Sequence, residues 1–336
     1  MLLELLILVG ILTVVFFELY PVKVLKVENC KLKGKFTKTN QKSFVVHVHT
    51  YFSYDSLGKP EEIEKVAQTL GVDKVFITDH DRKDLKGFFP PSDRLVFGWE
   101  YQDEVYGRLL KLAEGKYTVI AHPNNEKKAV YRFKNRYENH FFYELVNLKD
   151  VLQSSKFPLT LYFFFRSVVL YPLLGLKALD YFPKLIPLKS WIGLYLKRTR
   201  GKLKIIGGLD HHVKISFWEK PKKFFSIPHY SWSFYILKNK TFGEDIFTSL
   251  NDGSFYLSFC SSEIYVAGNR VLANRKRYLT FNHFGDGKVS VNSCGKIEKG
   301  AKVVAIYVYT FRVGKLFFGL TPLAVFRWDE TSAKGG

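Results

Sequence analysis

The sequence predicts an α/β protein with a membrane helix at its N-terminal end and a small β-rich unit at its C-terminal end. Three observations predict this fold class. The first 20 residues are almost wholly apolar, and from residue 43 to about residue 235 short apolar runs alternate with segments of helical character. After about residue 235 the chain is aromatic and β-branched, with frequent glycine and asparagine. These patterns are typical of a spanning helix, of strand–helix–strand units and of antiparallel strands, respectively.

Residues 1–20 are expected to form a transmembrane anchor helix. The run from Leu5 to Phe17 is apolar without interruption, and a stretch of about 19 residues makes roughly 28 Å of helix, close to a hydrocarbon core. The segment has no basic leading region and no small-residue cleavage site, which favours an anchor over a signal peptide. A buried core helix is the alternative. Residues 21–42 form a lysine-rich linker, and lysines beside an anchor favour a cytoplasmic location for the domain that follows.

Residues 43–235 are expected to form the central domain, with parallel strands and outer helices. Strands are expected at "SFVVHVHT", "DKVFITDHD", "DRLVFGWE", "KYTVIAHP", "HFFYELVN" and "KLKIIGGLDHH". A helix is expected at "KPEEIEKVAQTLG", because acids fill its first turn and a glycine ends it. This repetition predicts an α/β barrel or a doubly wound sheet, and polar clusters at the strand ends favour a barrel. The apolar insertion at 159–188 is either a helix packed on the core or an amphipathic element in the membrane interface.

Residues 236–330 are expected to form the β-rich C-terminal domain. The segments "GSFYLSFCSSEIYVAG", "KRYLTFNHFGDGKVSVNSCG" and "KVVAIYVYTFRVGKLFFG" combine aromatic and β-branched residues with glycine and asparagine. Such segments are typical of antiparallel strands joined by tight turns.

The composition limits the partners of the chain. Its 51 Lys and Arg residues exceed its 31 Asp and Glu residues, which gives a net charge of +20. This excess favours nucleic acid, an anionic membrane surface or a phosphorylated substrate, or it is simply a solvated basic surface. No specific nucleic-acid-binding motif accompanies the charge. The three cysteines are far apart, odd in number and without CxxC spacing, so neither a disulfide framework nor a cysteine zinc site is expected.

Side chains that bind metal ions follow several of the expected strands. His47 and His49 are alternate residues on one strand, so both should point to the same face. The other candidates lie where an apolar strand gives way to a loop, and such ends meet at one rim of an α/β fold. The expected metal ligands are His47, His49, Asp55, His80, Glu100, His122, Asp210 and His212. Imidazoles and carboxylates together suit Zn, Mn or Fe, and a carboxylate can bridge two ions.

In this order the motifs resemble those of the PHP superfamily, the polymerase and histidinol phosphatase family of metal-dependent phosphoesterases. "HVHTYFSYDS" matches its first motif and "TDHD" its second, the acid of "GWE" with "AHP" matches its third, and "GGLDHH" is similar to its last, usually GSDxH. The likeness covers residues 44 to about 215 and is closer to the stand-alone phosphoesterases, since no polymerase sequence follows. It implies a distorted, TIM-like (β/α)7 barrel with two or three divalent metal ions at the carboxyl ends of its strands.

The resemblance also implies how the ligands are shared between the ions. The implied sets are His47, His49, Glu100 and Asp210 for one ion, Asp55, His80 and His212 for a second, and Glu100 with His122 for a third. Asp55 stands where the family often has histidine, and no histidine lies between Glu100 and His122. Two ions are therefore expected.

The reaction that the resemblance implies is hydrolysis of a phosphate ester by a metal-bound water, with no protein nucleophile. Asp79 is expected to fix the tautomer of a ligand imidazole, and His211 is expected to be a polar neighbour rather than a ligand. The basic residues that follow the motif strands are candidates for binding the substrate phosphate. These residues are Arg82, Lys127, Lys128 and Arg132.

Two other function classes remain open. An amidohydrolase-type enzyme also begins with HxH, but it usually needs a bridging lysine on a middle strand, a position that Glu100 takes here. An inactive membrane scaffold with a relic site is the non-enzymatic alternative. The sequence names no substrate and does not separate phosphate monoesters from diesters.

Overall fold

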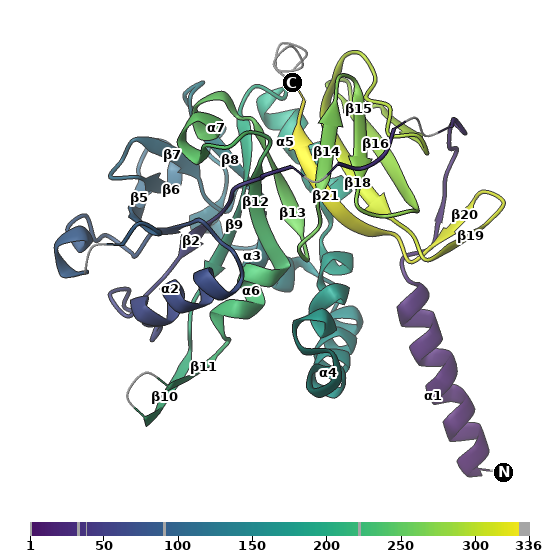
Figure 1. Ribbon diagram of the computed structural model, residues 1–336, viewed down its shortest axis with the longest axis horizontal. Coiled ribbons are helices and arrows are strands. Elements are labelled where there is room, and N and C mark those ends of the chain that lie inside the picture. Colours follow the sequence, from purple (N-terminus) through teal and green to yellow (C-terminus); the bar gives the residue numbers. More distant parts are fainter. Residues whose placement is uncertain (1, 32–33, 38, 90–91, 221–222, 329–336) are drawn as a thin grey trace.

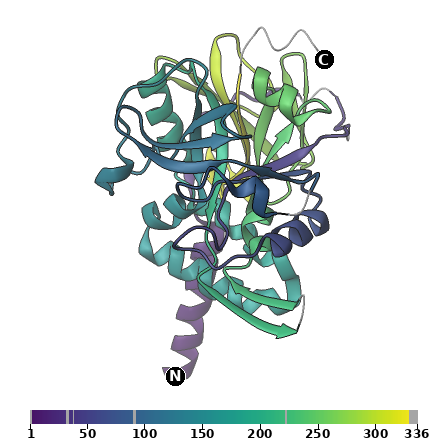
Figure 2. The same cartoon turned by 90° about the vertical axis from the view of Figure 1, so that its left-hand side faces the viewer.

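The computed structural model describes residues 2–31, 34–37, 39–89, 92–220 and 223–328. Residues 32–33 and 38 of the expected linker, and 329–330 of the expected C-terminal unit, lie outside the described residues. Figures 1 and 2 show one large body, from which the N-terminal helix projects away from the sheet.

The body is built on a 14-stranded mixed sheet. In spatial order, its main path is β17 (Val289–Asn292), β16 (Tyr278–Phe284), β18 (Ala301–Val308), β21 (Thr321–Arg327), β13 (Phe255–Phe259), β12 (Leu237–Thr241), β2 (Ser43–Val48), β9 (Lys204–His211), β8 (Phe142–Asn147), β7 (Tyr117–Ile120), β6 (Gly107–Leu112) and β5 (Trp99–Asp103). Off this path, β3 (Lys74–Ile77) pairs with β2 and with β4 (Leu95–Phe97). The pairs β4–β3, β3–β2, β2–β9, β9–β8 and β8–β7 are parallel, and antiparallel strands extend the sheet on both sides.

Seven α-helices, three 3-10 helices and three small sheets complete the described part of the chain. The α-helices are α1 (Leu2–Leu19), α2 (Pro60–Thr69), α3 (Leu148–Ser154), α4 (Phe157–Leu174), α5 (Leu188–Thr199), α6 (Tyr230–Ile236) and α7 (Ile246–Asp252). The 3-10 helices are η1 (Leu85–Phe88), η2 (Ala129–Tyr131) and η3 (Gly175–Leu185). The small sheets pair β1 (Lys23–Val24) and β19 (Phe311–Val313) with β20 (Leu316–Phe318), β10 (Ile215–Lys220) with β11 (Lys223–Ile227), and β14 (Ile264–Ala267) with β15 (Arg270–Ala273).

The mixed α/β class is confirmed, but the strand pairings of the described residues do not close a barrel. The repeated strand–helix pattern also breaks at β5, β6 and β7, which follow one another as antiparallel hairpins without a helical crossover. The expected antiparallel strands after residue 235 are also present, and β12 pairs directly with β2 in the same sheet. The division into domains at residue 235 stays a prediction.

Apolar side chains on both faces of the parallel strands hold the site-bearing end of the sheet in place. Every residue of β2 is buried, as expected for a parallel strand that is covered on both sides. Phe44 packs with Phe76 and Phe255 on one face, and Val45 joins the core that contains Val75 on the other. Burying one such side chain stabilises the fold by about 1.5–3 kcal/mol.

Helix α1 is long and apolar enough to cross a membrane, a test that a signal sequence near the N-terminus also passes. No residue of α1 is buried, so the alternative of a buried core helix is wrong. Helix α4 projects from the body on the same side as α1 (Figure 1). It buries only Leu159, Phe163 and Ser167. Its exposed large apolar side chains are Phe157, Leu161, Phe164, Phe165, Val168, Val169, Tyr171, Leu173 and Leu174. One stripe of the insertion thus packs on the body, as the first alternative expected, and the rest of the helix faces outward. Its placement in the membrane interface stays a prediction.

Cys30 and Cys294 form a disulfide, so the expectation of no such bond is wrong. The two residues are 264 positions apart in the chain, but the linker after α1 runs beside β17. There the Glu28 amide donates to the Val291 carbonyl at 2.8 Å, and the two cysteine Cα atoms come within 5.3 Å. Spacing along the sequence carries no information about such a long-range pairing. Cys260 is free.

Candidate metal centre

The eight expected ligands converge at the carboxyl ends of the parallel strands. His47 lies in β2, and His49 follows its end. His80 follows β3 and forms an isolated parallel bridge with Glu100 of β5. The other members of the set come from the end of β7, from β9 and from the loop after β2, namely His122, Asp210, His212 and Asp55. All are buried except Asp55, whose side chain is 27% exposed.

Three of these ligands have a backbone conformation that non-glycine residues rarely adopt. His47, His122 and Asp210 lie in the left-handed region, with φ values of 64°, 52° and 46°. The register of β2 shifts between Val45 and Val48, so His47 occupies an irregularity in the strand. Each such conformation costs about 1–3 kcal/mol and is typical of functional sites, where the surrounding fold maintains it.

The carboxylate of Glu100 lies at the centre of the cluster. Its Oε2 is 3.2 Å from Nε2 of His47, 3.3 Å from Nε2 of His49 and 3.2 Å from Nδ1 of His80. Its Oε1 is 3.6 Å from Nε2 of His122 and also accepts a hydrogen bond from Nε of Arg108 at 2.6 Å. One carboxylate therefore faces four imidazoles, an arrangement that suits a bridging ligand.

Asp210 forms a second focus next to Glu100. Its Oδ1 is 3.7 Å from Nε2 of both His47 and His49 and 3.2 Å from Nδ1 of His212. Its Oδ2 is 3.4 Å from Nε2 of His122 and 3.3 Å from the Lys149 ammonium group.

Asp55 closes the outer side of the cluster. Its Oδ1 is 3.1 Å from Nε2 of His212 and 3.5 Å from Nε2 of His80. The ring of Tyr54, the preceding residue, stacks on His80 at 4.9 Å between centroids. This side of the site therefore has a carboxylate and an aromatic wall.

The donor atoms fit divalent metal ions. Three sets have ligand atoms within 4.8 Å of one another, namely His49, His80 and His212; His47, His49 and Asp210; and His47, Glu100 and His122. The first of these sets differs from the expected one. The resemblance implies Asp55 as the third ligand beside His80 and His212, whereas the structure places His49 there. Four buried ligand atoms make no hydrogen bond of good geometry: His49 Nε2, Asp55 Oδ1, Asp210 Oδ2 and His212 Nε2. Ion-pair distances of 3.1 Å between His212 Nε2 and Asp55 Oδ1 and of 3.3 Å between Lys149 and Asp210 Oδ2 accompany three of them. Leaving such atoms unsatisfied costs about 1–3 kcal/mol each, and coordination to a cation removes that cost.

The acids of the cluster depend on positive charge beside them. Burial opposes ionisation of Glu100 and Asp210, but the neighbouring histidines outweigh it and hold both pKa values well below the usual range. Burial likewise opposes protonation of His47, but Glu144, Glu100 and Asp210 raise its pKa to about 10. The pKa values of His122 and His212 are raised too, whereas burial lowers those of His49 and His80. Protons on the first group of histidines thus offset the acids of the metal-free cluster, and bound cations would replace them.

Glu144, Asp150 and Arg108 are partners of the ligands that were not expected from the sequence, as are Lys149 and Ser53. Glu144 of β8 accepts from Nδ1 of His47 at 2.7 Å, and Asp150 of α3 accepts from Nδ1 of His122 at 3.0 Å. Arg108 of β6 contacts both Glu100 and, through a second guanidinium nitrogen, Nδ1 of His80 at 2.7 Å. A carboxylate on the far ring nitrogen is the usual partner of a metal-binding histidine. An acid within the apolar strand "FYELVN" was the available signal for Glu144.

Gly208 of β9 makes room for the Glu144 carboxylate. A Cβ atom at position 208 would lie 1.7 Å from Oε1 of Glu144, closer than any packing tolerates. Glu144 also accepts from the His122 amide at 2.8 Å and from the Asn147 side-chain amide at 3.1 Å. The glycine therefore permits a buried carboxylate that holds two strands of the site.

The expected supporting residues are only partly placed at the cluster. Asp79 accepts from the Thr50 amide and hydroxyl, each at 2.6 Å, and from the Ser53 hydroxyl at 2.7 Å. Ser53 Oγ is in turn 3.0 Å from Nδ1 of His49, so Asp79 supports His49 rather than the adjacent His80. His211 points elsewhere, with its Nε2 3.1 Å from the Pro228 carbonyl.

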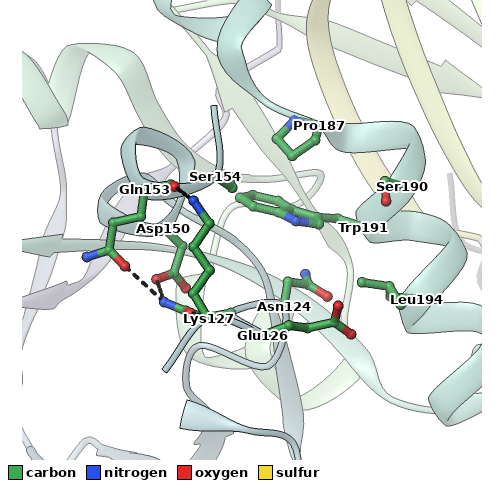
Figure 3. Close-up of a pocket in the computed structure, with 11 residues that line it drawn as sticks. Asn124, Glu126, Lys127, Asp150, Gln153, Ser154, Pro187, Ser190, Trp191 and Leu194 are labelled. Carbon is green, nitrogen blue, oxygen red and sulfur yellow. Dashed lines mark hydrogen bonds between the residues drawn. The ribbon is translucent and has the colours of Figure 1, made fainter. Parts of the chain in front are cut away.

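The four basic residues expected to bind phosphate lie outside the ligand cluster. Arg82 pairs with Asp84 at 2.9 Å, and Lys128 lies over the ring of Tyr131. Arg132 is exposed. Lys127 lines a cavity of about 290 Å³ and contacts the carbonyl of Gln153. Figure 3 shows this cavity between α3 and α5, with Asp150, the partner of His122, on its wall.

No protein-family model matches the chain, and a comparison with curated proteins gives no match. The geometry of the cluster is therefore the evidence from which a function can be inferred.

Proposed function

We propose that the chain is a membrane-anchored, metal-dependent phosphoesterase of the PHP type. The observation that carries the proposal is the convergence of eight imidazole and carboxylate ligands, several with unsatisfied buried donor atoms. Two divalent ions bound there, Zn, Mn or Fe, would supply Lewis-acid activation of water and of a phosphoryl oxygen.

The cations beside the cluster suit an anionic substrate. Arg108 is bonded to Glu100, and Lys149 is 3.3 Å from Asp210. A guanidinium group binds two phosphate oxygens at once, and an ammonium group acts as a point charge. If metal ions were to hold the two carboxylates, these side chains would be available to donate hydrogen bonds to a phosphate group. Tyr54 and Tyr131, stacked on His80 and His122 respectively, form the walls of the approach.

The body lies on the oxidising side of the membrane. The Cys30–Cys294 disulfide supports this placement, because cytoplasmic thiols are kept reduced. It argues against the cytoplasmic orientation expected from the linker lysines. Lysis of expressing cells in an alkylating agent tests the placement, since an intact bond protects both thiols. If Cys30 and Cys294 were alkylated in most molecules, the bond would be absent in the cell, and the result would favour a cytoplasmic body.

Hydrolysis of p-nitrophenyl phosphate and of bis(p-nitrophenyl) phosphate by the purified full-length chain tests the function. We expect Mn- or Zn-dependent hydrolysis of at least one ester. His49→Ala and Asp210→Ala should each lower it by more than the roughly 10–100-fold loss typical of outer partners. His140→Ala is the matched control, because His140 is exposed and contacts Phe141 outside the cluster. Retained hydrolysis in both ligand variants would refute the assignment, and cleavage of amides alone would favour the amidohydrolase alternative.

A further inference from the structure

A second cavity, of about 660 Å³, lies where α1 enters the body. Its walls come from the residues that follow α1, from the α3–α4 junction, from the η3–α5 junction and from β16, β18 and β21. It shares Ser154, Pro187 and Ser190 with the smaller cavity of Figure 3. None of the eight expected metal ligands lines it.

The lining of this cavity combines positive charge with apolar surface. Its lysines are Lys23, Lys156, Lys184 and Lys189. No acidic side chain is among the described residues that line it. Its apolar part includes Leu159, Leu185, Ile186, Phe281 and Leu320. A site of this kind fits an anion that carries a hydrocarbon chain, because the charged and apolar parts of the ligand each find a matching surface.

A buried imidazole in the wall lacks a partner. His283 of β16 is 3% exposed, and its Nε2 has no hydrogen-bond partner. Burial and then the charge of Lys189 lower the pKa of His283 to about 4, so its ring is neutral at neutral pH. A neutral imidazole can donate one hydrogen bond, and a phosphate oxygen in the cavity would accept it once the enclosed ring turned that nitrogen toward the cavity.

The position of the cavity places its ligand at the membrane surface. The ring of Phe17, near the end of α1, stacks on Tyr162 of α4 at 4.6 Å. Glu18 pairs with Arg166, and its carbonyl accepts from the Lys184 ammonium group at 2.6 Å. These contacts fix the end of the apolar helix against the body, and Tyr20, two residues later, lines the cavity. Lysines at the end of a spanning helix lie at the depth of lipid headgroups.

We propose that this cavity is a binding site for a phosphate-bearing lipid, with its phosphate on the lysines and His283 and an acyl chain on the apolar wall. The outward apolar face of α4 lies beside it and supports the same membrane contact. The site is independent of the metal cluster, so the lipid binds without metal ions.

A titration of the full-length chain in non-ionic detergent with EDTA, followed by native mass spectrometry, tests the proposal. The probes are dioctanoyl phosphatidate, dioctanoylglycerol and inorganic phosphate. We expect saturable binding of one phosphatidate. The other two probes should bind at least about tenfold more weakly, since each lacks one half of the recognised chemistry. If inorganic phosphate bound as tightly as phosphatidate, the cavity would be a site for free phosphate. If dioctanoylglycerol bound as tightly, the phosphate group would contribute nothing to binding. Either result overturns the proposal.

Two variants with changes in the cavity and one control variant with changes outside it locate the binding. Lys156→Glu with Lys189→Glu reverses two exposed charges of the cavity and should weaken phosphatidate binding at least about tenfold. Lys276→Glu with Lys299→Glu makes the same change in charge on exposed lysines outside it and should leave the affinity within about twofold. His283→Gln should also weaken binding, with thermal unfolding as the check on folding. Equal affinity in the cavity double variant and the wild type would refute the site, whatever the chain hydrolyses.

Discussion

Removing the charge of Glu144 should weaken metal binding although Glu144 is not itself an expected ligand. Its carboxylate lies 2.7 Å from Nδ1 of His47 and so directs Nε2 of that ring toward Glu100 and Asp210. Loss of such a partner typically costs about 10–100-fold in metal affinity, which corresponds to about 1.4–2.7 kcal/mol. We expect Glu144→Gln to fall in this range, because the side chain keeps its size and loses its charge.

Substitution of Gly208 is a second way to displace the Glu144 carboxylate. Gly208→Ala would place a Cβ atom 1.7 Å from Oε1 of Glu144, so the carboxylate must move away from His47. The two substitutions act on one contact, and the double variant should lose little more than either single variant. Gly207→Ala is the matched control, because its Cβ would meet Leu237 and Leu257 at 3.1 Å and disturb packing rather than the site.

Competition with a chromophoric chelator measures the Mn and Zn affinities of these variants, and thermal unfolding of the metal-free proteins separates affinity from folding. Glu144→Gln within twofold of the wild-type affinity would refute the role assigned to this residue. Additive losses in Glu144→Gln and Gly208→Ala would show that the glycine acts elsewhere.

Three further predictions concern protons and the disulfide. Metal affinity should rise between about pH 6 and pH 9, because His47, with its pKa of about 10, must release a proton to bind an ion. Chelator competition at several pH values measures this affinity, and an affinity that does not change with pH would contradict the prediction. The pKa of His283 is about 4 in the folded protein against 6.5 when unfolded, so between these values the unfolded chain binds a proton that the folded protein does not. The free energy of unfolding should therefore decrease, by up to about 3 kcal/mol, as the pH falls from 6.5 to 4. Metal-free denaturant unfolding should therefore depend less on pH in His283→Gln, and an unchanged dependence would contradict the assignment. Reduction of the Cys30–Cys294 disulfide should lower the free energy of unfolding by about 2–5 kcal/mol. Denaturant unfolding with and without reductant measures this difference, and no difference would show that the bond does not constrain the unfolded chain.

The sequence carries enough information to bring the ligands together, because of a general property of parallel strands. Each of His47, His80, His122 and Asp210 follows or ends an apolar run, and the carboxyl ends of parallel strands lie at one edge. No knowledge of the exact strand order was needed. The same property does not predict a closed barrel, since strand ends can converge without closure of the sheet.

The supporting partners depend on details that a sequence pattern does not encode. Glu144 reaches His47 across a register shift between β8 and β9, and it needs the missing side chain at Gly208. Arg108 reaches Glu100 because β5 and β6 form a hairpin with a particular pairing. The Cys30–Cys294 bond rests on contact between segments more than 260 residues apart. Each of these features is set by tertiary packing.

The metal content of the purified full-length chain tests the central claim most directly. Elemental analysis after supply of Mn or Zn should find about two equivalents per chain, a marked loss in Asp210→Ala and no loss in His140→Ala. Equal metal content in Asp210→Ala and the wild type, or no bound metal in either, would contradict the account.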